Sequence, residues 1–209
     1  MRMRYWLKIT GRTLLTGLLG GLAMSLYMML INSSMTWQDL VGMLPLYQLT
    51  MGAMGLFVWN STAIRSWLPV AIGFGCTRKE ALLGLQLQRI LAVLGVAVIV
   101  AAFSFIKSDY AQILRDHALA GIGVLLLVAS VGDLFGLAYE RFSAKGILVL
   151  VVVVAMAIIF GITLFTLSAL RRQDLPKNID LIVTAAALAL WAIDALAQRA
   201  MLRRYAVQY

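Results

Sequence analysis

Long apolar segments alternate with short polar ones along the chain. Six segments of about 20 residues contain few charged side chains and lie at residues 13–31, 40–58, 87–106, 118–139, 146–170 and 179–197. A helix of roughly 20 apolar residues crosses the hydrocarbon core of a bilayer and satisfies its own backbone polar groups there. The pattern therefore predicts an all-α, polytopic membrane protein in which residues 1–209 form a single domain of six transmembrane helices.

Composition excludes several classes of protein. Apolar residues make up 62% of the 209 residues and charged residues only 13%, which excludes a water-soluble enzyme or a nucleic-acid-binding domain. The net charge of +9 comes from basic residues beside apolar runs, so the expected partner is the lipid bilayer and not a nucleic acid. The one cysteine, Cys76, cannot form an intramolecular disulfide or a metal site by itself.

The basic residues also predict the orientation. With six spans and a cytoplasmic N-terminus, most of the 18 basic residues fall on the cytoplasmic side, as the positive-inside rule requires. The exceptions on the outer side are Lys107, Arg115, Arg171, Arg172 and Lys177. We therefore expect both termini in the cytoplasm and only short outer loops.

Two cytoplasmic segments stand out. Residues 1–12 combine basic residues with Tyr5 and Trp6, a pattern typical of an amphipathic helix at the membrane interface; the basic residues could equally be a plain orientation signal. Residues 59–86 form the only long cytoplasmic connection. Within it, Ile64, Trp67 and Leu68 fall at helical spacing.

A sharp turn is predicted inside this connection. Gly73 and Gly75 allow a bend, and Thr77 with Glu80 three residues later fits a capping box that opens the third span. Arg78 and Lys79 would then be exposed on a projecting element that could dock a cytoplasmic partner. The alternative is an ordinary basic loop.

The stretch Ile-Gly-Phe-Gly-Cys-Thr-Arg-Lys-Glu-Ala at residues 72–81 resembles the segment between the second and third spans of six-helix permeases of the ABC exporter type-2 class. Small bacterial members show a similar Phe-Gly-x-(Ser/Thr)-Arg-(Lys/Arg) run. The resemblance implies an N-terminal interface helix, a coupling helix between spans two and three, and a short connection between spans four and five. The residues it assigns to partner coupling are Ile64, Trp67, Leu68, Phe74, Thr77, Arg78, Lys79 and Glu80.

The function implied by the resemblance is half of the translocation pathway of an ATP-driven exporter in the bacterial cytoplasmic membrane. A second permease copy or a homologue would complete the pathway, and ATP and Mg²⁺ would bind a separate ATPase subunit. This chain has no Gly-rich phosphate loop, so we expect no enzymatic activity and no cofactor of its own. One departure from the family is that residues 171–178 leave little room for re-entrant helices before the last span.

Apart from Asp180 at the start of the last run, three charged residues lie within the apolar runs: Arg89, Asp133 and Asp194. A carboxylate at membrane depth costs roughly 2.5–3.5 kcal/mol on insertion scales, so it requires a partner or water. Asp133 could line a pathway or bind a cation, or it could be a structural carboxylate paired with Arg89 or Arg141. For Asp194 a structural ion pair is the simpler interpretation. Together with Gln86 and Gln88, these residues could form one network on the cytoplasmic side.

Pairs of small residues predict seams between helices. They recur at i, i+4 spacing and comprise Gly17 with Gly21, Gly132 with Gly136, and Ala185 with Ala189. Such seams occur within a subunit and between subunits alike.

Two other functions fit the same features. A non-transporting membrane regulator or immunity protein would hold a cytoplasmic partner through the connection at residues 59–86. A small intramembrane enzyme or secondary carrier would use Asp133, although no His, Glu or Ser motif accompanies it. His117, the one histidine, is expected to be a solvated loop residue.

Overall fold

The computed structural model describes residues 2–31, 36–73, 75–106, 108–141 and 178–204. Within these ranges the chain is helical and contains no strand. The elements are α1 (Arg2–Ile31), α2 (Trp37–Thr62), the π-helical turn η1 (Ala63–Trp67), α3 (Leu68–Gly73), α4 (Arg78–Phe103), α5 (Asp109–Asp116), α6 (Ala118–Arg141) and α8 (Ile179–Arg204).

Five of the described helices are long and apolar enough to span a membrane, namely α1, α2, α4, α6 and α8. This confirms an all-helical chain with several apolar helices for the described residues. The fifth predicted span, at residues 146–170, lies outside them. The loop predicted between residues 107 and 117 contains the short helix α5, which Ser108 caps by accepting a hydrogen bond from the Ala111 amide at 3.1 Å.

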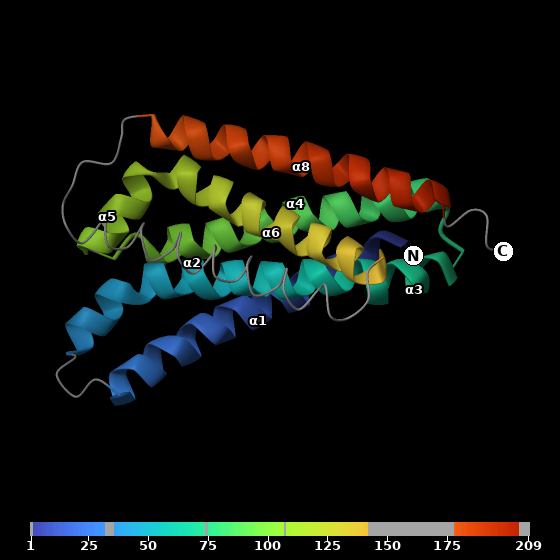
Figure 1. The fold of residues 1–209 in the computed structure, drawn as a ribbon. Coiled ribbons are helices and arrows are strands. Elements are labelled where there is room, and N and C mark those ends of the chain that lie inside the picture. Colours follow the sequence, from blue (N-terminus) through green and yellow to red (C-terminus); the bar gives the residue numbers. More distant parts are fainter. Residues whose placement is uncertain (1, 32–35, 74, 107, 142–177, 205–209) are drawn as a thin grey trace.

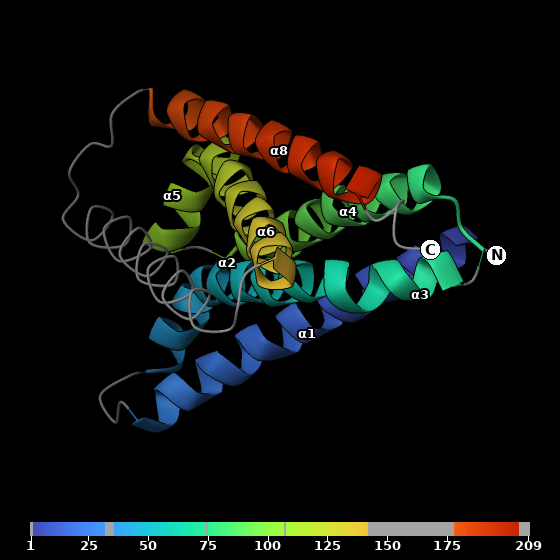
Figure 2. The ribbon, with the colours of Figure 1, turned by 45° about the vertical axis from the view of Figure 1, so that its right-hand side comes forward.

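The long helices lie side by side as a bundle (Figure 1). Helices α1 and α4 run in one direction, and α2, α6 and α8 run in the other, as the view in Figure 2 also shows. Contacts between side chains agree. His117, directly before α6, meets Asp180 in the first turn of α8, and Asp133 of α6 meets Gln198 of α8 toward the opposite end. The start of α1, the turn between α3 and α4, and the end of α8 therefore lie at the same end of the bundle.

Glycines let α2 approach its neighbours closely. A Cβ atom on Gly17 of α1 would lie 3.6 Å from the Cα of Gly52 in α2. On the other side of α2, a Cβ on Gly132 of α6 would lie 2.7 Å from the Phe57 carbonyl oxygen, and Gly136 meets the Ser61 carbonyl in the same way. The glycine seams of α1 and α6 thus pack within this chain, as small residues do between membrane helices.

The predicted alanine seam of α8 behaves differently. Ala185 and Ala189 are exposed, whereas Ala187 between them is fully buried. The face of α8 that packs against the bundle is therefore turned away from the i, i+4 alanine pair. Sequence spacing identified a small-residue stripe here but not its neighbour.

Helix α2 does not end where the predicted second span ends. It continues through η1 into α3, so one helical rod runs from Trp37 to Gly73. Pro69, the second residue of α3, has no amide proton and its ring crowds the carbonyl four residues earlier. The chain widens by one π turn just before it, where the Leu68 amide bonds to the Ala63 carbonyl five residues back. The widened turn carries the helix past the proline without a break.

Two apolar cores hold the bundle together. The larger one joins α2, α4, α5 and α6 around fully buried residues such as Leu56, Ala92 and Leu125. The smaller one lies at the end that carries the turn between α3 and α4, and it contains Trp6, Ile9, Ala63, Ile64, Leu68, Ala71, Ala81 and Leu85.

Candidate functional site

The turn between α3 and α4 is built from two standard caps. Gly75 has φ +78°, a left-handed conformation that glycine adopts without strain. Its amide bonds to the Ile72 carbonyl at 2.9 Å and the Cys76 amide to the Ala71 carbonyl at 3.1 Å, the pattern of a Schellman motif. We call residues 63–80, which comprise η1, α3 and this turn, the elbow.

The capping box predicted at the start of α4 is confirmed. The Thr77 hydroxyl accepts from the Glu80 amide at 3.3 Å, and the Thr77 amide donates to the Glu80 carboxylate at 2.8 Å. Both groups that would otherwise be unsatisfied at the helix start are thereby paired. The elbow therefore has a defined backbone conformation on both sides of the turn.

The structure divides the predicted coupling residues into two groups. Ile64 and Leu68 are buried in the smaller core and Trp67 is partly buried, so these side chains hold the elbow against the bundle and are not free to contact a partner. Thr77, Lys79 and Glu80 are exposed. Phe74 and the side chain of Arg78 lie outside the described part. The exposed surface of α3 instead includes Val70 and Ile72, which sequence reasoning did not select.

The N-terminal segment differs from the expected interface helix. Residues 2–12 are not a separate element, since α1 runs without interruption to Ile31. Trp6, expected in the headgroup layer, is 6% exposed and packs against Gly84 of α4. Ile9 joins the same core, whereas Lys8 and Arg12 are exposed. One face of this segment therefore supports the elbow, because the helical repeat places Trp6 and Ile9 on the same side.

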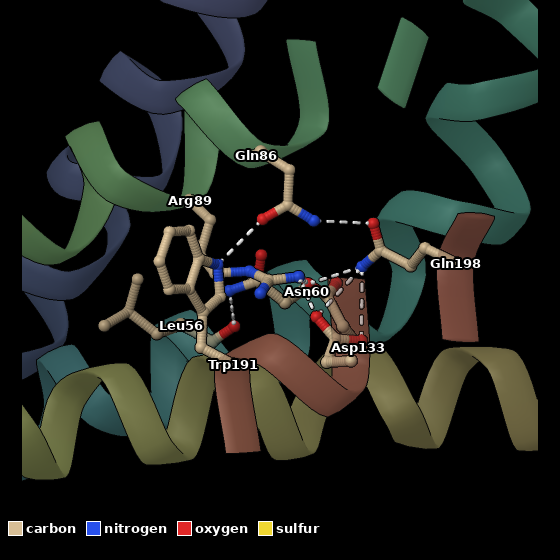
Figure 3. Close-up of polar contacts among 8 residues, drawn as sticks. Leu56, Asn60, Gln86, Arg89, Asp133, Trp191 and Gln198 are labelled. Carbon is tan, nitrogen blue, oxygen red and sulfur yellow. Dashed lines mark hydrogen bonds and ion pairs between the residues drawn. The ribbon is translucent and has the colours of Figure 1, made fainter. Parts of the chain in front are cut away.

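A buried polar cluster joins α4, α6 and α8 near the same end of the bundle. We define it as Gln86, Arg89, Asp133, Trp191, Asp194 and Gln198. The Nη2 atom of Arg89 forms an ion pair with Asp133 (Figure 3) and a second ion pair with Asp194. Arg89 and Asp194 are 0% exposed and Asp133 is 2% exposed.

Hydrogen bonds extend the cluster in a single direction. The Trp191 Nε1–H donates to Gln86 Oε1 at 2.8 Å, and Gln86 Nε2 donates to Gln198 Oε1 at 2.9 Å. Gln198 Nε2 then donates to Asp133 at 3.2 Å and to Asp194 at 3.1 Å (Figure 3). In this series of hydrogen bonds, each N–H group points toward the next acceptor, and the last ones donate to the two carboxylates. This arrangement stabilises the negative charge of the carboxylates.

The charges in the cluster indicate a structural role, in which ion pairs hold the helices together. Two carboxylates face one guanidinium, and each group is removed from solvent, so each depends on its partners to offset desolvation. Asp133 pairs with Arg89, one of the two partners considered for it, which comes from a different helix, whereas the Arg141 side chain lies outside the described part. Because Arg89 pairs with α6 and α8 at once, it ties α4 to both.

The structure brings together Arg89, Asp133 and Asp194, which the sequence placed in three separate runs. Trp191 was missed, although it lies one helical turn before Asp194 and therefore on the same face of α8. Arg199, close to Asp194 in sequence, is exposed. His117, expected in a solvated loop, lies 3.3 Å from Asp180, so it links the starts of α6 and α8.

The two sites consist of helix caps, ion pairs and hydrogen bonds. Among the described residues, no three His, Cys, Asp or Glu side chains gather as metal ligands would. Comparisons with protein-family models, with curated proteins and with solved structures find no match to this chain.

Proposed function

We propose that this protein is the permease subunit of an ATP-driven ABC exporter and forms half of the translocation pathway. The observation that carries the proposal is the elbow: a capped, well-packed turn between two long apolar helices, with Lys79 exposed at its tip. A separate ATPase subunit, which binds ATP and Mg²⁺, would dock there. The resemblance of residues 72–81 to the coupling segment of type-2 exporters supports the same interpretation.

The helices connected to the elbow could transmit its displacement through the bundle. Because α2 continues through η1 and α3 as one rod, a push on the elbow reaches α2 directly. The same push reaches α4, whose residue Arg89 lies about 16 Å along the helix from Arg78 at 1.5 Å per residue. Arg89 then passes the displacement to α6 and α8 through its two ion pairs. Rigid-body rocking of helices in this way would switch access to the pathway.

The proposal includes six spans with both termini in the cytoplasm. Helices α6 and α8 run in the same direction, so an odd number of membrane crossings must join them. The apolar run at residues 146–170 supplies one such crossing by length and composition. The positive-inside rule then puts the elbow on the cytoplasmic side, and in a bacterium the membrane would be the inner one.

The competing functions are less well supported. A secondary carrier or an intramembrane enzyme would need Asp133 accessible to its substrate, whereas Arg89 and Gln198 engage this carboxylate and the side chain is buried. A non-transporting regulator or immunity protein would use the elbow as well. It differs from an exporter subunit in its partner, which need not hydrolyse ATP.

Co-purification tests the proposal. Tagged protein extracted from its native membrane should bring down an ATP-hydrolysing chain in stoichiometric amount. Reversal of both charges at the elbow tip, Arg78→Glu with Lys79→Glu, should release that chain. The control Arg199→Glu, at a position that is exposed like Lys79, should retain it. Recovery of no ATPase, or full retention by the elbow variant, would reject the exporter function.

A further inference from the structure

A cavity lies at the end of the bundle opposite the elbow. It has a volume of about 230 Å³, is open on one side and is lined by residues of α2, α4, α5 and α6 and of the segment between α4 and α5. Its walls include Leu49, Leu114 and Leu125. The cavity sits where α4 ends at Phe103 and α6 begins at Ala118, which is the level at which a spanning helix leaves the hydrocarbon.

The interior of the cavity is apolar. Apart from Ser104 and Arg115, the lining residues are aliphatic, aromatic or glycine. Gly121 leaves part of the space open, since a Cβ atom added there would meet nothing within 4 Å. At the rim, Phe105 is 82% exposed and Ile122 is 37% exposed. The opening is therefore bordered by exposed apolar side chains, as expected for a surface that faces lipid.

One cation stands at the mouth of this apolar space. The Nη1 atom of Arg115 donates to the Ser104 carbonyl at 2.7 Å, which holds the guanidinium beside the cavity. The other N–H groups of Arg115 bond to no acceptor among the described residues and remain available. The neighbouring carboxylate, Asp116, does not line the cavity. An apolar hollow with a fixed guanidinium at its mouth is complementary to an amphiphile with an anionic head.

We propose that this cavity binds one anionic phospholipid of the surrounding bilayer, with part of an acyl chain between α4 and α6 and the headgroup phosphate on Arg115. The charge of Arg115 selects an anionic headgroup over a zwitterionic one. The position of the cavity at the membrane boundary makes a bilayer lipid the available ligand. The proposal is independent of the exporter function, because it involves neither the elbow nor an ATPase.

Native mass spectrometry of the purified protein provides the test, with phosphatidylglycerol and phosphatidylcholine of identical acyl chains as probes. We expect one phosphatidylglycerol to bind with a dissociation constant about fivefold lower than that of phosphatidylcholine, the factor typical of one basic residue at an anionic lipid surface. Arg115→Gln, at an exposed position, should abolish this preference. Lys79→Gln, at the other end of the bundle, should leave it unchanged.

A second variant tests the acyl-chain half of the site. Gly121→Leu should fill the open space and displace the specifically bound lipid. It should retain the helical circular dichroism of the parent, because a Cβ at this position meets nothing within 4 Å. Equal binding of the two lipids by the parent protein, an unchanged preference in Arg115→Gln, or an unchanged stoichiometry in folded Gly121→Leu would each overturn the proposal. The first result would identify the contact as ordinary solvation by lipid.

Discussion

Arg89→Met is the most informative perturbation of the polar cluster. Methionine retains much of the apolar stem of arginine but removes the guanidinium, which is the shared partner of Asp133 and Asp194. In the substituted protein two carboxylates would remain buried at 2% and 0% exposure. Their remaining shared donor is Gln198, whose amide already bonds to both.

The structure sets the expected size of the effect. Removal of one partner from a buried ion pair costs about 3–5 kcal/mol, because the other charge stays buried without compensation. Although two pairs are lost, Gln198 still donates to each carboxylate, so we expect the single-pair range. That range corresponds to a shift of about two to four powers of ten in the unfolding equilibrium. Titration with SDS in mixed micelles, followed by far-ultraviolet circular dichroism, measures this shift.

A neutralised variant separates charge from packing. Replacement of Asp133 and Asp194 by asparagine in the Arg89→Met background removes the unpaired charges at nearly constant volume, and it should recover most of the lost stability. Equal stability of Arg89→Met and the parent would refute the structural role of the ion pairs. If the neutralised variant were as unstable as Arg89→Met alone, packing and not charge would account for the loss.

Four further variants test other positions by the same unfolding assay. Thr77→Ala should cost about 1 kcal/mol, because the first turn of α4 loses its cap. Gly136→Val should cost about 1–3 kcal/mol, since the valine side chain would meet the backbone of α2. By contrast, Gly121→Ala should stabilise the protein by up to about 1 kcal/mol, because the position is helical and a Cβ there meets nothing within 4 Å. Trp191→Phe should cost about 1 kcal/mol because it leaves the partly buried Gln86 oxygen without its indole donor.

Much of the helical layout follows from the apolar runs. The predicted run at residues 118–139 matches α6 at its first residue, and the run at 179–197 matches the start of α8. The ends of the other helices were harder to predict, because a polar helix can extend a membrane span beyond its apolar part. Residues 78–86 are an example: this segment mixes charged and polar residues with apolar ones, yet it forms the first turns of α4.

The candidate sites were predictable to different degrees. The Gly75 turn and the Thr77 cap depend on neighbours in sequence, and local patterns identified both. The pairing of Arg89 with Asp133 and Asp194 depends on how three helices cross, which one-dimensional spacing does not contain. The burial of Ile64 and Leu68 was missed for the same reason: helical spacing showed that they share a face, but not that residues of α1, α4 and α6 join them in one core.

The two links between α6 and α8 restrict how this protein can change shape. His117 joins Asp180 at one end of the pair, and the cluster around Asp194 joins it at the other. Contacts near both ends of α8 oppose its translation along α6 and its rotation about its own axis. In a large conformational change we therefore expect α6 and α8 to move together as one rigid body. The helix interfaces that change would then lie elsewhere in the bundle.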